Sequence, residues 1–452
     1  MNVSIADVVR QFKQAWTTHL DDRAIVAACH GAGHTWRDRL LDPVRTMRLF
    51  FLQILYGNTA CTHLPHLSGL SFSATAYCEA RKRLPLAVFE TLLEHTTKQL
   101  NNDLRGAARW LGHRLFLLDG SNFSMPDTAQ LRNYFGQSGQ QQLGCGFPVA
   151  HWLVLVHAAT GMVLKMLTAP LRTHDLSGVM ELHPALERND VLVADRAFSS
   201  FAHVALLLAR GVHAVFRAHQ RLLVEFTPGR PHVSPTGGKS SRKKGRPRSR
   251  WLKLLGVKDQ LVQWLKPADC PSWMSAEQFA ALPLQMVVRE LQYRVARRGF
   301  RTDVVTLVTT LLDPQRYPVE ELAALYGQRW SIETNFDHLK TTMKLDVLKC
   351  QTVDGVLKEL TMFVLVYNLV RLVMLAAAAR QRVDVERISF VDALRWLAAA
   401  QPDQPLGRLV VNPHRPWRVE PRVRKRRPKE YPLMRAPRFA LRQRILDAPL
   451  AP

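Results

Sequence analysis

The chain has 452 residues, of which 47% are hydrophobic and 22% are charged. These values lie near globular averages and exclude wholesale disorder or a fibrous repeat, and the length suits roughly two to four domains. The charge is unusual, because 62 Lys and Arg against 37 Asp and Glu give a net charge of +25. Such an excess costs stability through self-repulsion, so it indicates a polyanionic partner, with nucleic acid ahead of an acidic membrane surface.

Two segments concentrate this charge. Residues 237–250 have seven basic residues and no acidic one, and residues 412–444 have twelve basic residues against two acidic ones. These two basic arms contribute +7 and +10, so only +8 is left for the rest of the chain. We expect the arms to bind DNA phosphates without sequence preference and in a salt-sensitive way. The expected contacts are Lys239, Arg242, Lys243, Lys244 and Arg246 in the first arm, and Arg424, Lys425, Arg426 and Arg427 in the second.

Residues 1–104 are predicted to form a helical N-terminal DNA-binding domain. An amphipathic run at 40–55 predicts one helix, and residues 72–82 predict a second helix with a serine N-cap. The second helix ends in the basic triplet 81–83. Two interpretations stay open for this triplet: a solvated helix end that suits the helix dipole, and a helix-turn-helix-like module that contacts DNA.

The periodicity changes near residue 105, where a mixed α/β domain is predicted to begin. Its first part is expected at 105–220, a β-rich insertion with the first basic arm at 221–299, the second part at 300–375, and a helical C-terminal region with a basic tail at 376–452. The predicted strands are 114–118, 149–158, 162–168, 191–194, 213–217, 251–257, 261–265, 283–295 and 304–312, and the predicted helices are 176–187, 200–210 and 318–343.

One apolar stretch, residues 360–379, is long enough to cross a bilayer. Asn368 and Arg371 lie near its middle, and a central arginine is costly in lipid. We therefore expect a buried helix of a soluble domain and no membrane partner. Six scattered cysteines without a Cys-x-x-Cys pair, and an N-terminus that lacks the apolar core of a signal peptide, favour a cytoplasmic protein.

Two aspartates end, or directly follow, short apolar strands: Asp119 and Asp195. Such carboxylates project into the crevice where open α/β sheets bind ligands. Either one alone is commonly a turn or cap residue. Two of them are better explained as a pair that faces one divalent metal, because Mg²⁺ prefers oxygen ligands and leaves room for phosphate oxygens.

The predicted helix at 318–343 has a polar line beside its apolar stripe. At about 100° per residue, Tyr326, Arg329, Glu333 and Lys340 fall within roughly 60° of one another. A salt-bridged surface is the ordinary explanation, but a carboxylate between two cations, beside aromatic residues, better fits a third metal ligand flanked by phosphate-binding groups. Three carboxylates with nearby cations on a basic chain predict two-metal phosphoryl transfer on nucleic acid.

The spacing Tyr-x2-Arg-x3-Glu-x6-Lys resembles the YREK signature of bacterial DDE transposases of the insertion-sequence-four family. Residues 118–121 and 194–196 resemble the first and second aspartate motifs of that family, and an insertion lies between the second Asp and the Glu. The resemblance covers roughly residues 110 to 375, with a weaker likeness at 73–85. Asp337 is the one nearby carboxylate that could compete with Glu333, and the spacing selects Glu333.

The resemblance implies a ribonuclease H-like core and cut-and-paste transposition by a homodimer on double-stranded transposon ends and target DNA. It implies hydrolytic nicking, hairpin formation and resolution, and strand transfer, in a bacterial cytoplasm and at the nucleoid. The implied ligands of two Mg²⁺ ions, for which Mn²⁺ can substitute, are Asp119, Asp195 and Glu333, and the implied contacts to terminal phosphates are Tyr326, Arg329 and Lys340.

Family members can flip a terminal base onto a tryptophan. Trp330 and Arg196 are therefore candidate contacts to a flipped base or a DNA end, and Trp251, Trp264 or Trp273 in the insertion could stack the base. A local β core is the ordinary alternative for each insertion tryptophan. Two rival functions stay open: a two-metal nuclease without strand transfer, and a domesticated or inactive DNA-binding derivative, against which the intact set of three acids argues.

Overall fold

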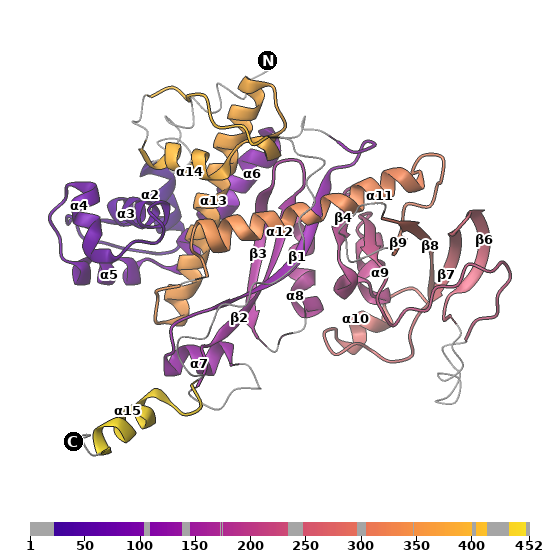
Figure 1. Cartoon of the computed structure of the whole chain (residues 1–452), viewed down its shortest axis with the longest axis horizontal. Helices are drawn as coiled ribbons and strands as arrows, with labels where there is room; N and C mark the ends of the chain where they lie inside the picture. The colour runs from indigo at the N-terminus through magenta and orange to yellow at the C-terminus, as the bar shows by residue number, and fades with distance from the viewer. Residues whose placement is uncertain are drawn as a thin grey trace.

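The computed structural model describes residues 22–103, 109–137, 145–171, 173, 175–233, 247–295, 304–346, 348–399, 404–413 and 434–448. Within them, the N-terminal helices lie at one end of a long mixed sheet, other helices lie along it, and strands from residues 250–294 form its other end (Figure 1). Both parts of the molecule that the sequence predicts to be basic arms lie largely outside the described residues. This applies to Lys239, Arg242, Lys243, Lys244, Arg246, Arg424, Lys425, Arg426 and Arg427.

Nine strands of the described chain form one sheet, in the order β3-β2-β1-β4-β5-β9-β8-β7-β6. β2 is antiparallel to β1 and β3, whereas β4 and β5 run parallel to β1. This order and direction of the first five strands is ribonuclease H-like and confirms the predicted mixed α/β class. The strands are β1 Leu115–Ser124, β2 Val149–His157, β3 Met162–Pro170, β4 Val191–Ala194, β5 His213–Arg217, β6 Arg250–Gly256, β7 Asp259–Leu265, β8 Gln285–Arg294 and β9 Val304–Thr309.

The strands β6–β9 continue the central sheet and do not form a sheet of their own. β9 pairs antiparallel with β5 on one side and with β8 on the other, and β7 and β6 follow. The β-rich region of residues 221–299 is therefore built onto the catalytic sheet through β9. Its strands agree with those predicted from alternation in the sequence.

Helices cover both faces of the sheet. Alternate residues of β1 enter two different cores: Leu115 and Leu117 face one, and Phe116 and Leu118 face the other. Burial on both faces explains why this strand is a continuous apolar run. The helices are α2 Asp22–Gly31, α3 Pro43–Leu55, α4 Leu64–Ser68, α5 Ala74–Arg83, α6 Leu86–Asp103, α7 Ala129–Phe135, α8 Asp175–Leu182, α9 Phe201–Ala209, α10 Ala276–Ala280, α11 Val319–Gln328, α12 Trp330–Asp337, α13 Val353–Gln381, α14 Phe390–Ala399 and α15 Arg438–Asp447.

The apolar helix α13 is a core helix of the fold. It is the one described helix long and apolar enough to cross a membrane, and 89% of its apolar window is buried inside the protein. Its two central polar residues bind the β2–β3 hairpin. Asn368 exchanges two hydrogen bonds with the backbone of Val163, and Arg371 donates to the carbonyl of Thr160. These bonds explain an asparagine and an arginine within an otherwise apolar helix.

The basic triplet at the end of α5 points in two directions. Arg81 turns inward, donates to Gln53 Oε1 at 3.0 Å and to Cys350 Sγ at 2.8 Å, and lies 4.3 Å from the centroid of the Phe50 ring. It therefore joins the N-terminal helices to the core, a role that neither interpretation of the triplet included. Lys82 and Arg83 are exposed. The predicted serine cap is Ser73, whose side chain accepts from the backbone of Ala76.

Candidate active site

The register of two parallel strands places the two aspartates side by side. The β1–β4 ladder ends at the pair Leu118 and Ala194, so Asp119 and Asp195 are the next residues on neighbouring strands. Asp195 follows its strand, as predicted, and its side chain caps the short helix that begins at Arg196. Asp119 does not end its strand. β1 continues to Ser124 because it stays paired with β2 beyond the aspartate, which corrects the sequence prediction.

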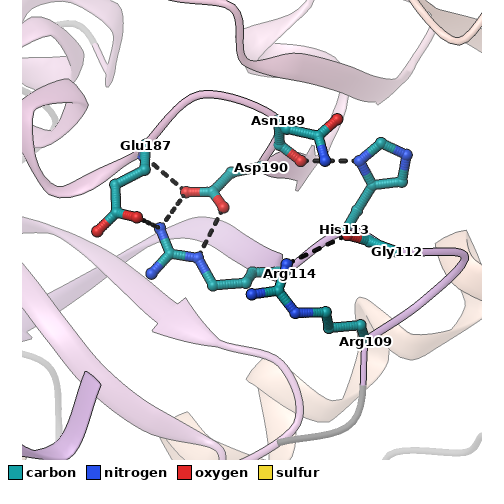
Figure 2. A network of polar contacts seen from close by, with 7 residues as sticks. All are labelled: Arg109, Gly112, His113, Arg114, Glu187, Asn189 and Asp190. Carbon is teal, nitrogen blue, oxygen red and sulfur yellow. Dashed lines mark hydrogen bonds and ion pairs between the residues drawn. The ribbon is translucent and has the colours of Figure 1, made fainter. Parts of the chain in front are cut away.

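A buried ion pair fixes that register at the opposite end of the same two strands (Figure 2). Arg114 directly precedes β1 and Asp190 directly precedes β4, and the guanidinium binds both carboxylate oxygens at 2.8 and 2.7 Å. Asp190 also accepts a hydrogen bond from the backbone of Glu187. Each member of the pair lies five residues before one of the aspartates. This pair was not predicted from the sequence, although Arg114 and Asp190 are equally spaced from the two aspartates.

The third acid reaches the site through Arg329. This arginine lies between α11 and α12, donates to Asp119 Oδ2 at 3.2 Å and donates to Glu333 Oε1 at 3.1 Å. Its Nε has no hydrogen-bond partner in the described part of the chain. One guanidinium therefore joins an acid of the sheet to an acid of the helix that crosses it (Figure 1).

The electrostatics of Asp119 are those of a crowded, half-buried carboxylate. Burial raises its pKa to about 6, against the opposing effect of Arg329, and the nearby negative charges of Asp195 and Glu333 raise it further. Burial also raises the pKa of Tyr326, which lies near both Arg329 and Asp195. A carboxylate held among two others, in a site that disfavours negative charge, attracts a cation.

Lys340 approaches the site from the far end of the predicted helix. Its Nζ donates to the carbonyl of Asn122 on β1 at 2.6 Å, and burial lowers its pKa. The helix is not regular to this point, because residues 338–342 form a π-turn after α12. The prediction of one continuous α-helix over residues 318–343 is therefore wrong at two points: the helix is interrupted at Arg329, between α11 and α12, and it changes to a π-helical segment after Asp337. π-turns are frequent at functional sites, and this one widens the turn that carries Lys340.

The aromatic and base-contact candidates occupy different surroundings. The Arg329 guanidinium lies 5.3 Å from the ring centroid of Trp330 and 5.9 Å from that of Tyr326, so two rings flank it. Arg196 is half-buried and donates to Gln220 at 3.4 Å. Trp264 is buried and donates to Glu290 at 3.1 Å, as expected of a local β core. Trp251 and Trp273 are half-buried.

One histidine beside the acids was missed. His151 on β2 lies opposite Asn122 and shares a hydrogen bond with its side chain at 2.7 Å. A Cβ at Gly120 would lie 3.1 Å from the His151 ring, so a larger residue next to Asp119 would require that ring to shift by a few tenths of an ångström. A lone histidine on a strand gives no sequence signal, which is why only the structure brings it to this site.

The donor set suits a hard divalent cation, because it consists of carboxylate oxygens from three nearby acids, two of them half-buried. In the present arrangement, however, Arg329 lies between Asp119 and Glu333 and supplies the positive charge. Across the described ranges, no three His, Cys, Asp or Glu side chains are close enough to form a ready metal-binding group. The chemistry of the residues fits a metal, and Arg329 must leave one or both carboxylates before they can bind it.

Comparison with known proteins gives consistent matches. The family model described as transposase DDE domain matches residues 110–369, a range that contains all three acids. The chain is 25% identical over 381 residues to the transposase InsG for insertion sequence element IS4 of Escherichia coli (strain K12), covering 79% of this chain and 78% of InsG. It is 28% identical over 132 residues to the putative transposase InsZ of the same organism, covering 28% of this chain and 42% of InsZ.

Among solved structures, a piggyBac transposase synaptic complex with hairpin DNA is similar, with a TM-score of 0.43 and 11% sequence identity. The alignment covers 85% of this chain and 78% of the piggyBac chain.

Proposed function

Because the chain belongs to the transposase DDE domain family, we propose that it is the DNA transposase of an insertion sequence, and that Asp119, Asp195 and Glu333 are its catalytic acids. The observation that carries the proposal is the convergence of these acids: strand register sets two of them side by side, and Arg329 ties the third to the first. The reaction is cut-and-paste transposition, with hydrolytic nicking, hairpin formation and resolution, and strand transfer.

The three acids would hold two Mg²⁺ ions, or Mn²⁺ in their place. Divalent ions bound there would activate the attacking oxygen and stabilise the leaving oxygen at a phosphodiester bond. The burial and mutual repulsion that raise the pKa of Asp119 make this position favourable for added positive charge.

The cationic and aromatic residues of the same face would position the transposon end. Arg329 is planar and presents several donors, so it can exchange its carboxylate partners for a terminal phosphate. Tyr326 and Lys340 would complete the phosphate contacts on either side of it. Trp330, which flanks Arg329, and Arg196, which follows the second aspartate, are the proposed contacts to a flipped base or to the DNA end.

The remaining parts of the chain would bind DNA away from the chemistry. The N-terminal helices would recognise the terminal inverted repeats, and the two basic arms would bind phosphates on end or target DNA. Two ends must be held together for transposition, so the working form would be a homodimer on double-stranded DNA. We place this activity in the bacterial cytoplasm, at the nucleoid.

A cleavage assay with Glu333→Gln tests the proposal. The DNA carries the inverted repeats that flank the gene, and the reaction contains Mg²⁺ and a target plasmid. We expect the variant to bind ends nearly as well as the wild type but to lose end cleavage by at least about a thousandfold, because it lacks one acid of the site. Asp337→Asn is the matched control, since it removes the next exposed carboxylate of α12 and should leave cleavage near the wild-type rate.

Three outcomes would contradict the proposal. Full cleavage by Glu333→Gln would remove Glu333 from the mechanism. Cleavage by the wild type without any joined product, given precleaved ends and plasmid, would identify a two-metal nuclease instead of a transposase. A wild-type protein that binds ends but never cleaves them would be an inactive DNA-binding derivative.

A further inference from the structure

The N-terminal helices contain a second cationic site, away from the three acids. A cavity of about 350 Å³ lies between the segment that links α2 to α3, the start of α3 and the end of α5. Its walls include Arg37, Arg39 and Arg83, the side chains of His34 and Trp36, and Thr46. No element of the proposed catalytic site contributes to it.

The charged groups of this cavity are available to a ligand. None of the three guanidinium groups forms an ion pair within the part of the chain that the structure describes, and all three residues are exposed. The cavity wall also contains His34, whose pKa is lowered by burial first and then by the nearby positive charges of Arg83 and Lys358. Three unpaired arginines around one cavity are placed to bind an anion with several oxygens.

The cavity also offers a flat apolar surface and an unpaired hydroxyl. The Trp36 ring stacks on His34, with centroids 5.7 Å apart, and lies 5.0 Å from the His30 ring, so its plane is held in place. Thr46 is 1% exposed, and its Oγ1 has no hydrogen-bond partner among the described residues. A buried hydroxyl left unpaired in a cavity wall is costly unless a ligand or water completes it.

We propose that this cavity binds one nucleotide unit of a DNA strand: the arginines hold its phosphate, the Trp36 indole packs against its sugar or base, and Thr46 Oγ1 bonds a phosphate oxygen. Arginine and hydroxyl donors are the usual phosphate partners in protein–DNA interfaces, and an aromatic face accepts any base. The inference rests on the proposed function, because it names the place where the N-terminal helices would hold transposon-end DNA.

A binding assay without metal tests the cavity separately from catalysis. Fluorescence anisotropy in EDTA measures the affinity of the full chain for a duplex that carries the terminal inverted repeat, over a series of salt concentrations. We expect Arg37→Ala/Arg39→Ala to weaken binding by at least about tenfold and to lower the slope of log K against log salt by about 2. The control is Arg23→Ala/Arg48→Ala, which removes two exposed arginines of α2 and α3 outside the cavity, one of which, Arg48, is paired with Asp22. It should change the affinity less than threefold.

Thr46→Val is a second test variant, because valine has nearly the same shape as threonine but lacks the hydroxyl. We expect it to weaken DNA binding about threefold to tenfold without lowering the thermal unfolding temperature, because it removes a hydroxyl that has no partner among the described residues. Equal DNA affinity in wild type, Thr46→Val and Arg37→Ala/Arg39→Ala would overturn the proposal, even if cleavage and strand transfer proceed normally. Conversely, the wild type could fail to cleave or join DNA while the variants still lose DNA binding. The proposed function would then be wrong, but the cavity would still be a DNA-binding site.

Two further probes separate the sources of the ligand. Equilibrium dialysis with dAMP should detect no binding below about 1 mM, because a single free nucleotide lacks the neighbouring phosphate contacts of a strand. If dAMP bound, and Arg37→Ala/Arg39→Ala abolished that binding while DNA affinity stayed constant, the cavity would be a free-nucleotide site. If a glutamate-rich peptide bound instead, and Arg37→Ala/Arg39→Ala abolished that binding while DNA affinity stayed constant, the cavity would bind an acidic protein partner. Either result would overturn binding of a DNA strand.

Discussion

Arg329 has two opposite tasks at one position. In the structure it neutralises Asp119 and Glu333, and in the proposed reaction it contacts a phosphate. Both partners are anions, so one guanidinium cannot serve them fully at the same time. Cation binding by the acids and phosphate binding by Arg329 should therefore support each other, because the first frees the side chain that the second needs.

Arg329→Ala tests this exchange. Without DNA, we expect the variant to bind Mn²⁺ several-fold more tightly than the wild type, because the acids lose a competing positive charge. With DNA, hairpin formation should fall, because the end phosphate loses its positioning contact. Electron paramagnetic resonance of free Mn²⁺ measures the Mn²⁺ affinity, and a cleavage gel measures hairpin formation. Arg316→Ala, an exposed arginine that precedes α11, is the control. Unchanged Mn²⁺ affinity in Arg329→Ala would show that the guanidinium does not compete.

Sequence patterns single out individual candidate residues of the site more readily than they predict the contacts between them. Asp119, Asp195 and Glu333 stand out because carboxylates after apolar strands and on a helix border have few structural uses. The contacts among them were not accessible, since periodicity places Arg329 on a face but does not say which acids it touches. Arg81 shows the same limit: its charge indicated a DNA contact or a solvated helix end, but only tertiary packing turns it toward Cys350.

At the scale of elements, the strand pair β1–β4 is held at both ends by charged residues. Arg114 and Asp190 bind each other before the strands begin, and the two aspartates follow five residues later on each strand. A parallel pair slipped by one residue would move an aspartate to the opposite face of the sheet. The buried pair can thus act as a positioning contact for the proposed catalytic acids, without touching them.

Arg114→Met should reveal this role. It leaves Asp190, which is 2% exposed, as an unpaired buried acid, so we expect a loss of about 3 kcal/mol in the free energy of unfolding. Arg114→Met/Asp190→Asn should recover most of the stability, because no buried charge is left unpaired. Urea unfolding measures both. If the double variant regained stability but not end cleavage, the pair would be needed for positioning; equal recovery of both would mean that it is needed only for folding.

Element positions were predicted well where hydrophobic periodicity was strong, as in the β2–β3 hairpin and α13. Pairing was not predicted. Alternation in residues 251–295 identifies strands, but it cannot tell whether they form a separate sheet or join an existing edge, because both arrangements bury one face. The π-turn after α12 was equally hidden, since its residues also suit an ordinary helix.

At the scale of the whole molecule, charge is uneven. The two basic arms hold +17 of the +25, while the body that contains the three acids is only mildly basic. Long-range attraction to DNA and the chemistry at the acids should therefore respond to different changes. Attraction to DNA depends on the number of phosphates neutralised and on salt, whereas the chemistry depends on a few side chains at one place in the fold.

A variant of the first basic arm separates non-specific DNA binding from end cleavage. In it, serine replaces Lys239, Arg242, Lys243, Lys244 and Arg246. We expect affinity for an unrelated duplex to fall, and the slope of log K against log salt to shrink by up to about 4, because as many as five phosphate contacts are lost. Cleavage of ends at saturating DNA should keep its rate. Filter binding at several salt concentrations and a single-turnover cleavage assay provide the measurements. An unchanged salt slope would exclude the first arm from DNA binding.

The continuity of the nine-stranded sheet also sets an order of assembly during protein synthesis. β5 pairs on one edge with β4, but its other partner, β9, is made only after residues 218–303 have been translated. Until then the nascent sheet has an open edge, which can attract other strands. Glu333 follows later still. A chain released early from the ribosome would carry two of the three acids and an unfinished sheet, so an enzyme that cuts DNA would be harmless until its core is complete.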